Sequence, residues 1–159
     1  MTAELKKDGT LELKIRREFP FPRELVFEAW LNKDHLAKWM GPTPDISLVH
    51  TEVNAKQGGA YRLGFQEKGC SDSTSYVHGE YLEIIKPEKL VFTWIWEEPL
   101  PEAGIQTLVT VEFSETKIGT EILLTHQKFM DEASRERHDQ GWCGTFDKLG
   151  SRLPQFSSQ

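Results

Sequence analysis

Hydrophobic and polar residues alternate along several short stretches of the chain, a pattern typical of β-strands with one buried face. In the first stretch, residues 10–19, Leu11, Leu13 and Ile15 alternate with charged side chains. Six more stretches have strand character, at residues 46–54, 60–68, 76–85, 90–96, 106–115 and 120–129. Because most connections between them are short turns, the sequence predicts an antiparallel sheet of about seven strands.

Apolar side chains spaced by three and four residues indicate helices elsewhere in the chain. Two short helices are predicted at residues 22–31 and 33–40, and the "GPTP" segment that follows ends the pair. A long helix begins near Asp131 and carries one apolar stripe, formed by Trp142, Phe146, Leu149 and Leu153. Gly141 and Gly144 lie inside this helix. Each costs about 1 kcal/mol relative to alanine, which indicates close packing or a pocket entrance.

The segment "KLVFTWIWEEP" at residues 89–99 contains two tryptophans in one strand. Side chains of a strand alternate between its faces, so Phe92, Trp94 and Trp96 share one face with Leu90. The opposite face is largely apolar as well. Such a strand needs cover on its aromatic side, either from a packed helix or from a molecule held in a cavity.

Length and composition narrow the class of protein. The chain has 159 residues, which suits one domain with one core. Its net charge of −6 comes from scattered acidic residues, so we do not expect nucleic acid as a partner. No apolar run approaches the roughly 20 residues of a membrane span. With Cys70 and Cys143 alone, and no recognisable secretory leader, we expect a cytoplasmic protein with reduced thiols.

Several ordered segments of the chain are similar to a known family. They are "FPFPRELVFEAWLNKDHLAKWMGP", "KQGGAY", "HGEYLEIIKPEKLVFTW", "GTEILLTHQKF" and "GWCGTFDKL". Together they resemble the single-domain homologues of the C-terminal domain of the heat-shock-protein-90 ATPase activator, within the SRPBCC or START-like superfamily. The resemblance runs from about residue 10 to residue 153.

The resemblance implies an α+β helix-grip fold, in which a curved antiparallel sheet of about seven strands wraps around the long C-terminal helix. Two short helices follow the first strand. It implies one START-like ligand-binding domain at residues 10–153. Residues 1–9 are polar and are expected to be a disordered tail, and residues 154–159 to be a C-terminal tail. Related proteins bind small hydrophobic molecules in a cavity between sheet and helix. The activator has a further N-terminal domain for its main chaperone contacts, so we do not expect chaperone activation here.

Strand parity and the stripe of the last helix select candidate ligand-binding residues for that cavity. They are Trp39, Tyr61, Phe65, His78, Trp94, Trp96, His126, Trp142 and Phe146. Mostly aromatic side chains with a few polar groups are the usual composition of a ligand pocket. For any one of these aromatic residues, plain core packing is the alternative. Trp39 is either an entrance residue or a contact between the two short helices.

The five histidines are weighed separately, because imidazole is a common general base and metal ligand. His35 and His50 are expected at the solvated surface, whereas His126 lies on an apolar strand face where it needs a hydrogen-bond partner. Cys143 and His138 are five positions apart on a helix, about 140° around its axis, which argues against a nucleophile and base pair. The sequence has no metal-ligand spacing and no phosphate-binding loop, so we expect neither a metal nor a cofactor.

We therefore expect non-enzymatic binding of a small hydrophobic or aromatic molecule, in a carrier, sensor or stress-related role. One alternative is an enzyme similar to polyketide cyclases or hydrolases, in which His126 or Tyr61 moves protons. A second alternative is a chaperone-accessory role, which requires an exposed apolar patch. A homodimer is compatible with the sequence, but nothing in it specifies an interface.

Overall fold

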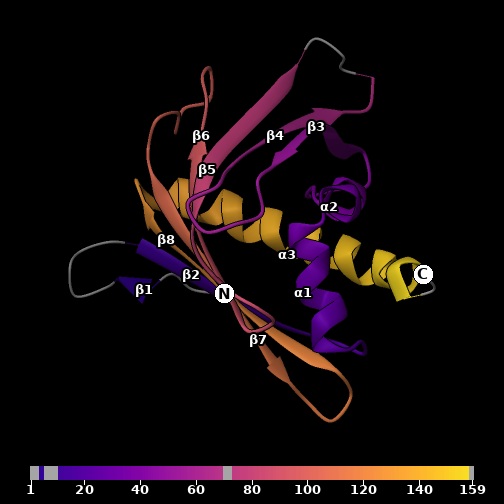
Figure 1. The fold of residues 1–159 in the computed structure, drawn as a ribbon. Coiled ribbons are helices and arrows are strands. Elements are labelled where there is room, and N and C mark those ends of the chain that lie inside the picture. The colour runs from indigo at the N-terminus through magenta and orange to yellow at the C-terminus, as the bar shows by residue number, and fades with distance from the viewer. Residues whose placement is uncertain (1–3, 6–10, 70–72, 158–159) are drawn as a thin grey trace.

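The computed structural model describes residues 4–5, 11–69 and 73–157. One antiparallel sheet curves around a long helix (Figure 1). Its strands are β1 (Glu4–Leu5), β2 (Leu11–Phe19), β3 (Ile46–Val53), β4 (Ala60–Glu67), β5 (Thr74–Ile85), β6 (Lys89–Trp96), β7 (Thr107–Glu115) and β8 (Thr120–Phe129). Their order across the sheet is β1-β2-β8-β7-β6-β5-β4-β3, so the first long strand lies beside the last.

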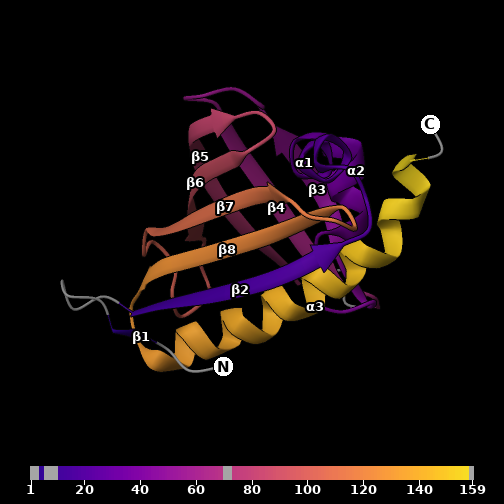
Figure 2. The ribbon, with the colours of Figure 1, turned by 90° about the horizontal axis from the view of Figure 1, so that it is seen from below.

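Three helices pack on one face of this sheet, the face toward which it curves. They are α1 (Arg23–Leu31), α2 (Lys33–Trp39) and α3 (Glu132–Ser157). The side chain of Asn32 accepts hydrogen bonds from the backbone N–H groups of Asp34 and His35, which fixes the start of α2. Figure 2 shows α3 running along the sheet below β2 and β8, with α1 and α2 gathered near its C-terminal half.

Local irregularities in strand pairing accompany the curvature of the sheet. The register shifts between Leu48 and His50 in the β3–β4 pair and between Tyr81 and Glu83 in the β5–β6 pair. An extra residue on one strand bends that strand and increases its twist. The curved sheet therefore has a concave face, on which the helices pack.

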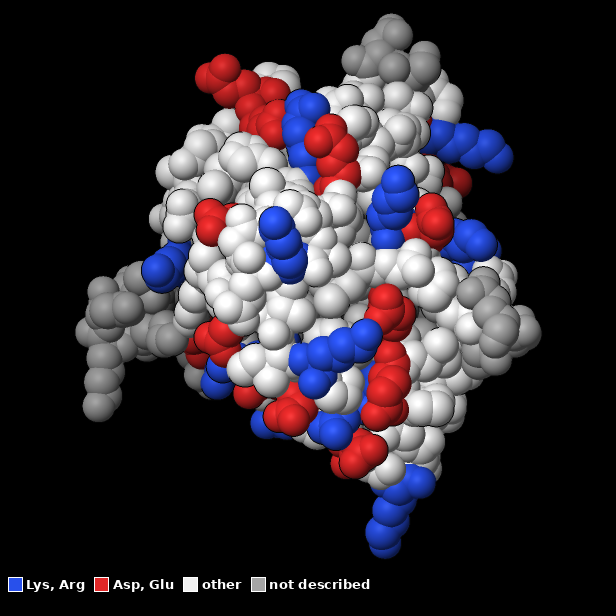
Figure 3. Space-filling view, in the orientation of Figure 1, with Lys and Arg blue, Asp and Glu red and all other residues white. Residues whose placement is uncertain are grey.

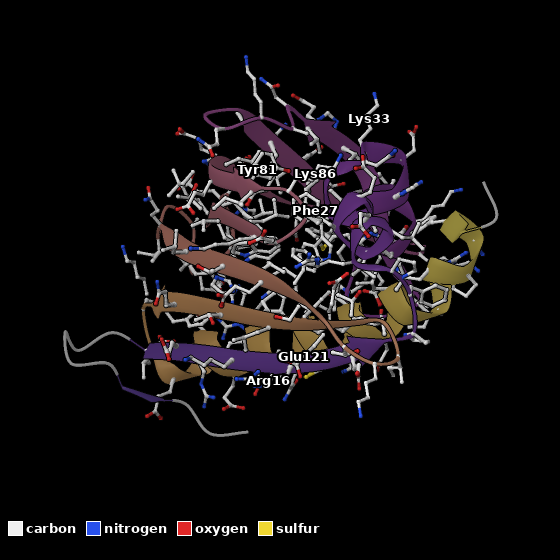
Figure 4. All side chains as sticks on the ribbon, turned by 60° about the horizontal axis from the view of Figure 1, so that its bottom comes forward. Arg16, Phe27, Lys33, Tyr81, Lys86 and Glu121 are labelled. Atoms are coloured by element: carbon white, nitrogen blue, oxygen red, sulfur yellow. The ribbon has the colours of Figure 1, made fainter. Side chains whose placement is uncertain are left out.

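The core lies between the concave face and the three helices. Residues of the inner face that reach zero exposure include Leu90, Val109, Val111, Ile122 and Leu124. Phe27 of α1 points inward and its ring lies 5.0 Å from that of Phe113 on β7 (Figure 4). On the opposite face, Arg16 of β2 pairs with Glu121 of β8 at 3.0 Å. From Leu13 to Phe19 the alternation seen in the sequence of β2 is thus an alternation between core and surface, whereas Glu12 is buried.

The sequence prediction of a helix-grip fold with seven strands, two short helices and a long C-terminal helix is confirmed. Three details differ from it. The short strand β1 lies inside the segment predicted as a tail, and the other residues of that tail are outside the described ranges. Helix α3 continues past Leu153 to Ser157, with Pro154 inside it. His35 is buried, because its ring stacks on Phe156 of α3 at 4.0 Å.

Acidic and basic side chains are mixed on the surface. On the face shown in Figure 3, lysine and arginine lie next to aspartate and glutamate, and no large area carries one sign of charge. Ion pairs between neighbouring elements, such as Lys86 with Glu28 at 3.3 Å, contribute to this pattern. Among the described residues, no helix is long and apolar enough to cross a membrane.

Candidate functional site

A pocket of about 360 Å³ lies between the sheet and the N-terminal half of α3. Its sheet side comes from β4 and β6, and its helix side from residues 137–145. Ile46 of β3 and Ser75 of β5 also line it, and the segment between α2 and β3 and the loop after β6 contribute Pro42 and Leu100 among others. Glu67 and Ser73, two exposed residues, also line the pocket and mark its solvent side.

Four aromatic side chains form much of the wall. Trp94 and Trp96 come from β6, Phe65 from β4 and Trp142 from α3. The rings of Trp94 and Trp96 are perpendicular, with centroids 5.6 Å apart, and Trp94 lies 5.2 Å from Trp142. Such edge and tilted contacts suit aromatic pairs and leave ring faces and edges for a ligand. The two tryptophans of β6 thus share the concave face, as their spacing predicts.

Two glycines of α3 face the segment that follows α2. A Cβ atom on Gly144 would lie 1.9 Å from the carbonyl oxygen of Pro42, so no other residue fits there without movement of the backbone. A Cβ atom on Gly141 would meet only the Pro42 side chain, at 3.9 Å. Gly144 therefore permits the close approach that the sequence indicated, while Gly141 leaves space in the pocket.

His138 of α3 holds Trp96 in place. The indole Nε1–H of Trp96 donates to His138 Nε2 at 2.8 Å, and His138 Nδ1–H donates to the Ser134 carbonyl at 2.7 Å. Both ring nitrogens are used, which requires the neutral imidazole with its proton on Nδ1. Burial lowers the pKa of His138, although the Ser134 carbonyl and Glu102 act in the opposite direction.

His126 of β8 makes an equivalent bond to the helix. Trp142 Nε1–H donates to His126 Nδ1 at 3.0 Å, so the proton of the imidazole lies on Nε2 and is donated to Thr107 Oγ1 at 2.8 Å. The Thr107 hydroxyl donates in turn to the backbone carbonyl of Trp94 at 2.7 Å. Complete burial lowers the pKa of His126 well below its ordinary value, and the neighbouring His138 acts in the same direction. The chain of bonds is therefore that of a neutral, fully paired histidine.

An ion pair lies at one edge of the pocket. The carboxylate of Glu102 accepts from Arg137 Nη2 at 2.7 Å and from Ser134 Oγ at 3.2 Å. Burial opposes ionisation of Glu102, but the bond to Arg137 and other favourable contacts outweigh it and lower the pKa. Glu102 thus ties the loop after β6 to the first turns of α3.

The structure brings four of the nine predicted site residues together in this pocket: Phe65, Trp94, Trp96 and Trp142. His126 lies behind the wall, hydrogen-bonded to Trp142. Phe146 lies one turn further along α3, where it packs against Trp30 and Phe19. The apolar stripe of α3 therefore begins at the pocket, with Trp142, and continues into the closed core, with Phe146.

The remaining three predicted site residues lie outside the pocket lining. Trp39 is fully buried, contacts Trp30 and donates its indole N–H to the Ala29 carbonyl at 2.9 Å. Of its two expected roles, this geometry is that of a contact between the short helices. Tyr61 donates its hydroxyl to the Thr93 carbonyl at 2.5 Å, and burial raises its pKa well above the ordinary value. His78 is half-exposed and pairs with Glu97 at 2.9 Å.

Sequence reasoning did not select several residues that line the pocket, including Met40, Ile46, Glu102, Arg137, His138 and Thr145. The spacing of residues in the sequence could have indicated those that lie on α3. Arg137, His138 and Thr145 lie four before, three before and four after Gly141, so they share its face. No pattern in the sequence places Glu102, because it belongs to a loop. Cys70 lies outside the described residues, and Cys143 does not line this pocket.

The polar groups do not form a metal-binding cluster. Within the described ranges, no group of three or more His, Cys, Asp or Glu side chains is arranged to hold a metal ion. The groups that line the site are mainly aromatic rings, together with hydroxyl groups, Glu67 and the Glu102–Arg137 pair.

Comparisons with known proteins agree with this fold. A family model described as "Activator of Hsp90 ATPase homolog 1-like protein" matches residues 20–153. None of the curated proteins compared with the chain matches it. A structure from Chromobacterium violaceum has a TM-score of 0.79 and 22% identity, covering 89% of this chain and 96% of its own. The AHSA1 protein from Silicibacter pomeroyi has the same TM-score and identity, with 91% and 98% covered. An AHSA1-like protein from Aeromonas hydrophila has a TM-score of 0.74 and 18% identity, with 93% and 95% covered.

Proposed function

The chain belongs to the family of Activator of Hsp90 ATPase homolog 1-like proteins, and we propose that it uses its pocket to bind a small, mainly apolar molecule without chemical conversion. The observation that carries the proposal is a pocket of about 360 Å³ lined by three tryptophans and Phe65. Concave sites with mostly aromatic walls and few polar groups are typical of ligand binding. A carrier or sensor role follows from this chemistry.

The hydrogen bonds of the two histidines support binding over proton transfer. Both nitrogens of His126 and of His138 already have partners, and burial lowers the pKa of each. A general base needs a free nitrogen within hydrogen-bond reach of the substrate. Tyr61 has its hydroxyl bonded to a backbone carbonyl, outside the pocket lining. The residues suggested for the enzyme alternative are thus engaged in holding the structure.

The expected affinity is modest. At about 25 cal/mol per Å², burial of roughly 300 Å² of apolar ligand surface contributes about 7 kcal/mol. The loss of translational and rotational freedom reduces this value. We therefore expect dissociation constants in the micromolar range or weaker.

The test combines identification and titration. Mass spectrometry of an extract of the natively purified protein should detect a retained small molecule, and its addition to stripped protein should change tryptophan fluorescence. Three of the five tryptophans line the pocket, so the fluorescence change should be large. No retained molecule, and no response to a chemically broad panel, would contradict the proposal.

Gly141→Leu makes this test specific to the pocket. The new side chain enters the space that Gly141 leaves open, and the helix gains from replacement of a glycine. We expect ligand affinity to fall at least about tenfold with no loss of thermal stability. Ser151→Leu, at an exposed position of the same helix, is the matched control and should bind as the wild type does.

A further inference from the structure

The three indole groups that line the pocket differ in their hydrogen bonding. Trp96 Nε1–H and Trp142 Nε1–H each donate to a histidine. Trp94 Nε1–H is buried and has no partner within the described part of the chain. Buried donors are nearly always paired, because a donor that loses its water without gaining an acceptor is costly. A free donor in the wall of a pocket therefore points to an acceptor on the ligand.

The protein groups around Trp94 do not supply that acceptor. Its neighbours are the rings of Trp96, Trp142 and His126, at 5.6, 5.2 and 6.0 Å. Both nitrogens of His126 are occupied, by Trp142 and Thr107. The backbone carbonyl of Trp94 itself already accepts from Thr107. These rings and paired polar groups therefore leave the indole N–H of Trp94 without an acceptor among the described residues.

We propose that the ligand carries a neutral carbonyl group on an apolar ring system, and that Trp94 Nε1–H donates to the carbonyl oxygen; this rests on the proposed function. The charges of the lining favour a neutral group over a carboxylate. Arg137 is paired with Glu102, and Glu67 adds a further negative charge. Because Trp94 Nε1 is shielded from solvent, the oxygen reaches it when a neighbouring ring turns. Trp96 is the neighbouring tryptophan that is only partly buried, and its turning requires that the bond from its indole N–H to His138 breaks.

The test uses two probes of nearly equal shape, 1-tetralone and tetralin, which differ by one carbonyl group. Their dissociation constants are measured by calorimetry for the wild type and for Trp94→Phe. The preference for tetralone is the ratio of the dissociation constant of tetralin to that of tetralone. We expect this ratio to be about fivefold greater in the wild type than in Trp94→Phe, because one hydrogen bond contributes a factor of about that size. Trp30→Phe is the matched control. Trp30 also has a buried, unpaired indole N–H, but it does not line the pocket.

A spectrum of the wild-type protein tests the same bond without a variant. The five tryptophans give five indole N–H signals in a ¹H–¹⁵N correlation spectrum. Tetralone should shift the assigned Trp94 signal downfield, tetralin should not, and the Trp30 signal should stay in place. If both probes bind with no difference at Trp94, the inference is overturned and the proposed function stands. If neither probe binds and no other small molecule does, both are overturned.

Discussion

The two halves of helix α3 lie against the same sheet but have different surroundings. In the C-terminal half, Phe146, Leu149 and Leu153 have no exposed surface and pack into the core. In the N-terminal half, His138, Gly141 and the residues near them face a pocket instead. One helix therefore closes the core at one end and lines a cavity at the other.

The difference lies in what holds each half. The C-terminal half is held mainly by close apolar packing in the core, to which Lys148 adds a hydrogen bond to the Ile46 carbonyl at 2.8 Å. The N-terminal half is held by directional bonds, from Trp96 to His138 and from Trp142 to His126. Hydrogen bonds fix the orientation of large rings, whereas apolar packing alone favours filling of any space. A pocket can therefore persist beside a closed core in a domain of this size.

Truncation in the closed half should have the largest effect. Leu149→Ala removes a fully buried side chain and leaves a cavity, so we expect the free energy of unfolding to fall by about 2–5 kcal/mol. Thr145→Ala, on the pocket side, should cost about 1 kcal/mol or less, because its hydroxyl donates within its own helix, to the Gly141 carbonyl. Urea denaturation measures both. Equal losses at the two positions would break the contrast between the halves.

The boundary between the halves should be nearly as sensitive. Gly144→Ala places a methyl group 1.9 Å from the Pro42 carbonyl oxygen, a contact that only a backbone shift relieves. We expect a loss of about 1–3 kcal/mol in the free energy of unfolding. Gly150→Ala is the matched control, because its methyl group would meet Phe19 at 3.4 Å, at the edge of ordinary contact. It should be neutral or stabilising by up to about 1 kcal/mol. Equal stability of the two variants would argue against the close approach.

The smallest expected effect is a pH dependence that originates in the pocket half. Burial lowers the pKa of His126 and of His138 in the folded protein, so below about pH 6.5 the unfolded chain binds protons that the folded protein does not. The contribution of these two neutral histidines to the free energy of unfolding is therefore fully present above pH 6.5, and it is lost as the pH falls below that value. The pKa values of Glu97 and Glu102 are lowered from 4.5, so their contribution is lost only at more acidic pH.

Thermal melting between pH 8 and pH 5 measures this dependence. His138→Gln keeps an acceptor for Trp96 but does not titrate, so its melting temperature should fall less steeply with acidification. An identical slope in the wild type and in His138→Gln would show that His138 does not contribute.

Much of the fold could be predicted because its patterns are local. Alternation in β2 and the stripe on α3 both report one apolar face, and the structure buries those faces. Alternation also placed Phe92, Trp94 and Trp96 on one face of β6. Alternation does not tell which residues of that face pack in the core and which line the pocket, because this depends on their position along the strand. Phe92 packs with Tyr61 and Tyr81 in the core, while Trp94 and Trp96 line the pocket.

The sequence by itself determined the order of elements from β2 to α3, the inner face of strands such as β2, β6 and β8, and a need for close packing or a pocket entrance at Gly141 and Gly144. Periodicity and the steric demands of glycine act within a few residues, so these features are local. Only the tertiary structure decided where the closed core ends and the pocket begins. It joins His138 to Trp96 and His126 to Trp142, and it places Glu102 beside Arg137. These pairs are 16 to 42 residues apart in the chain, so only the curvature of the sheet and the path of α3 across it determine that they meet.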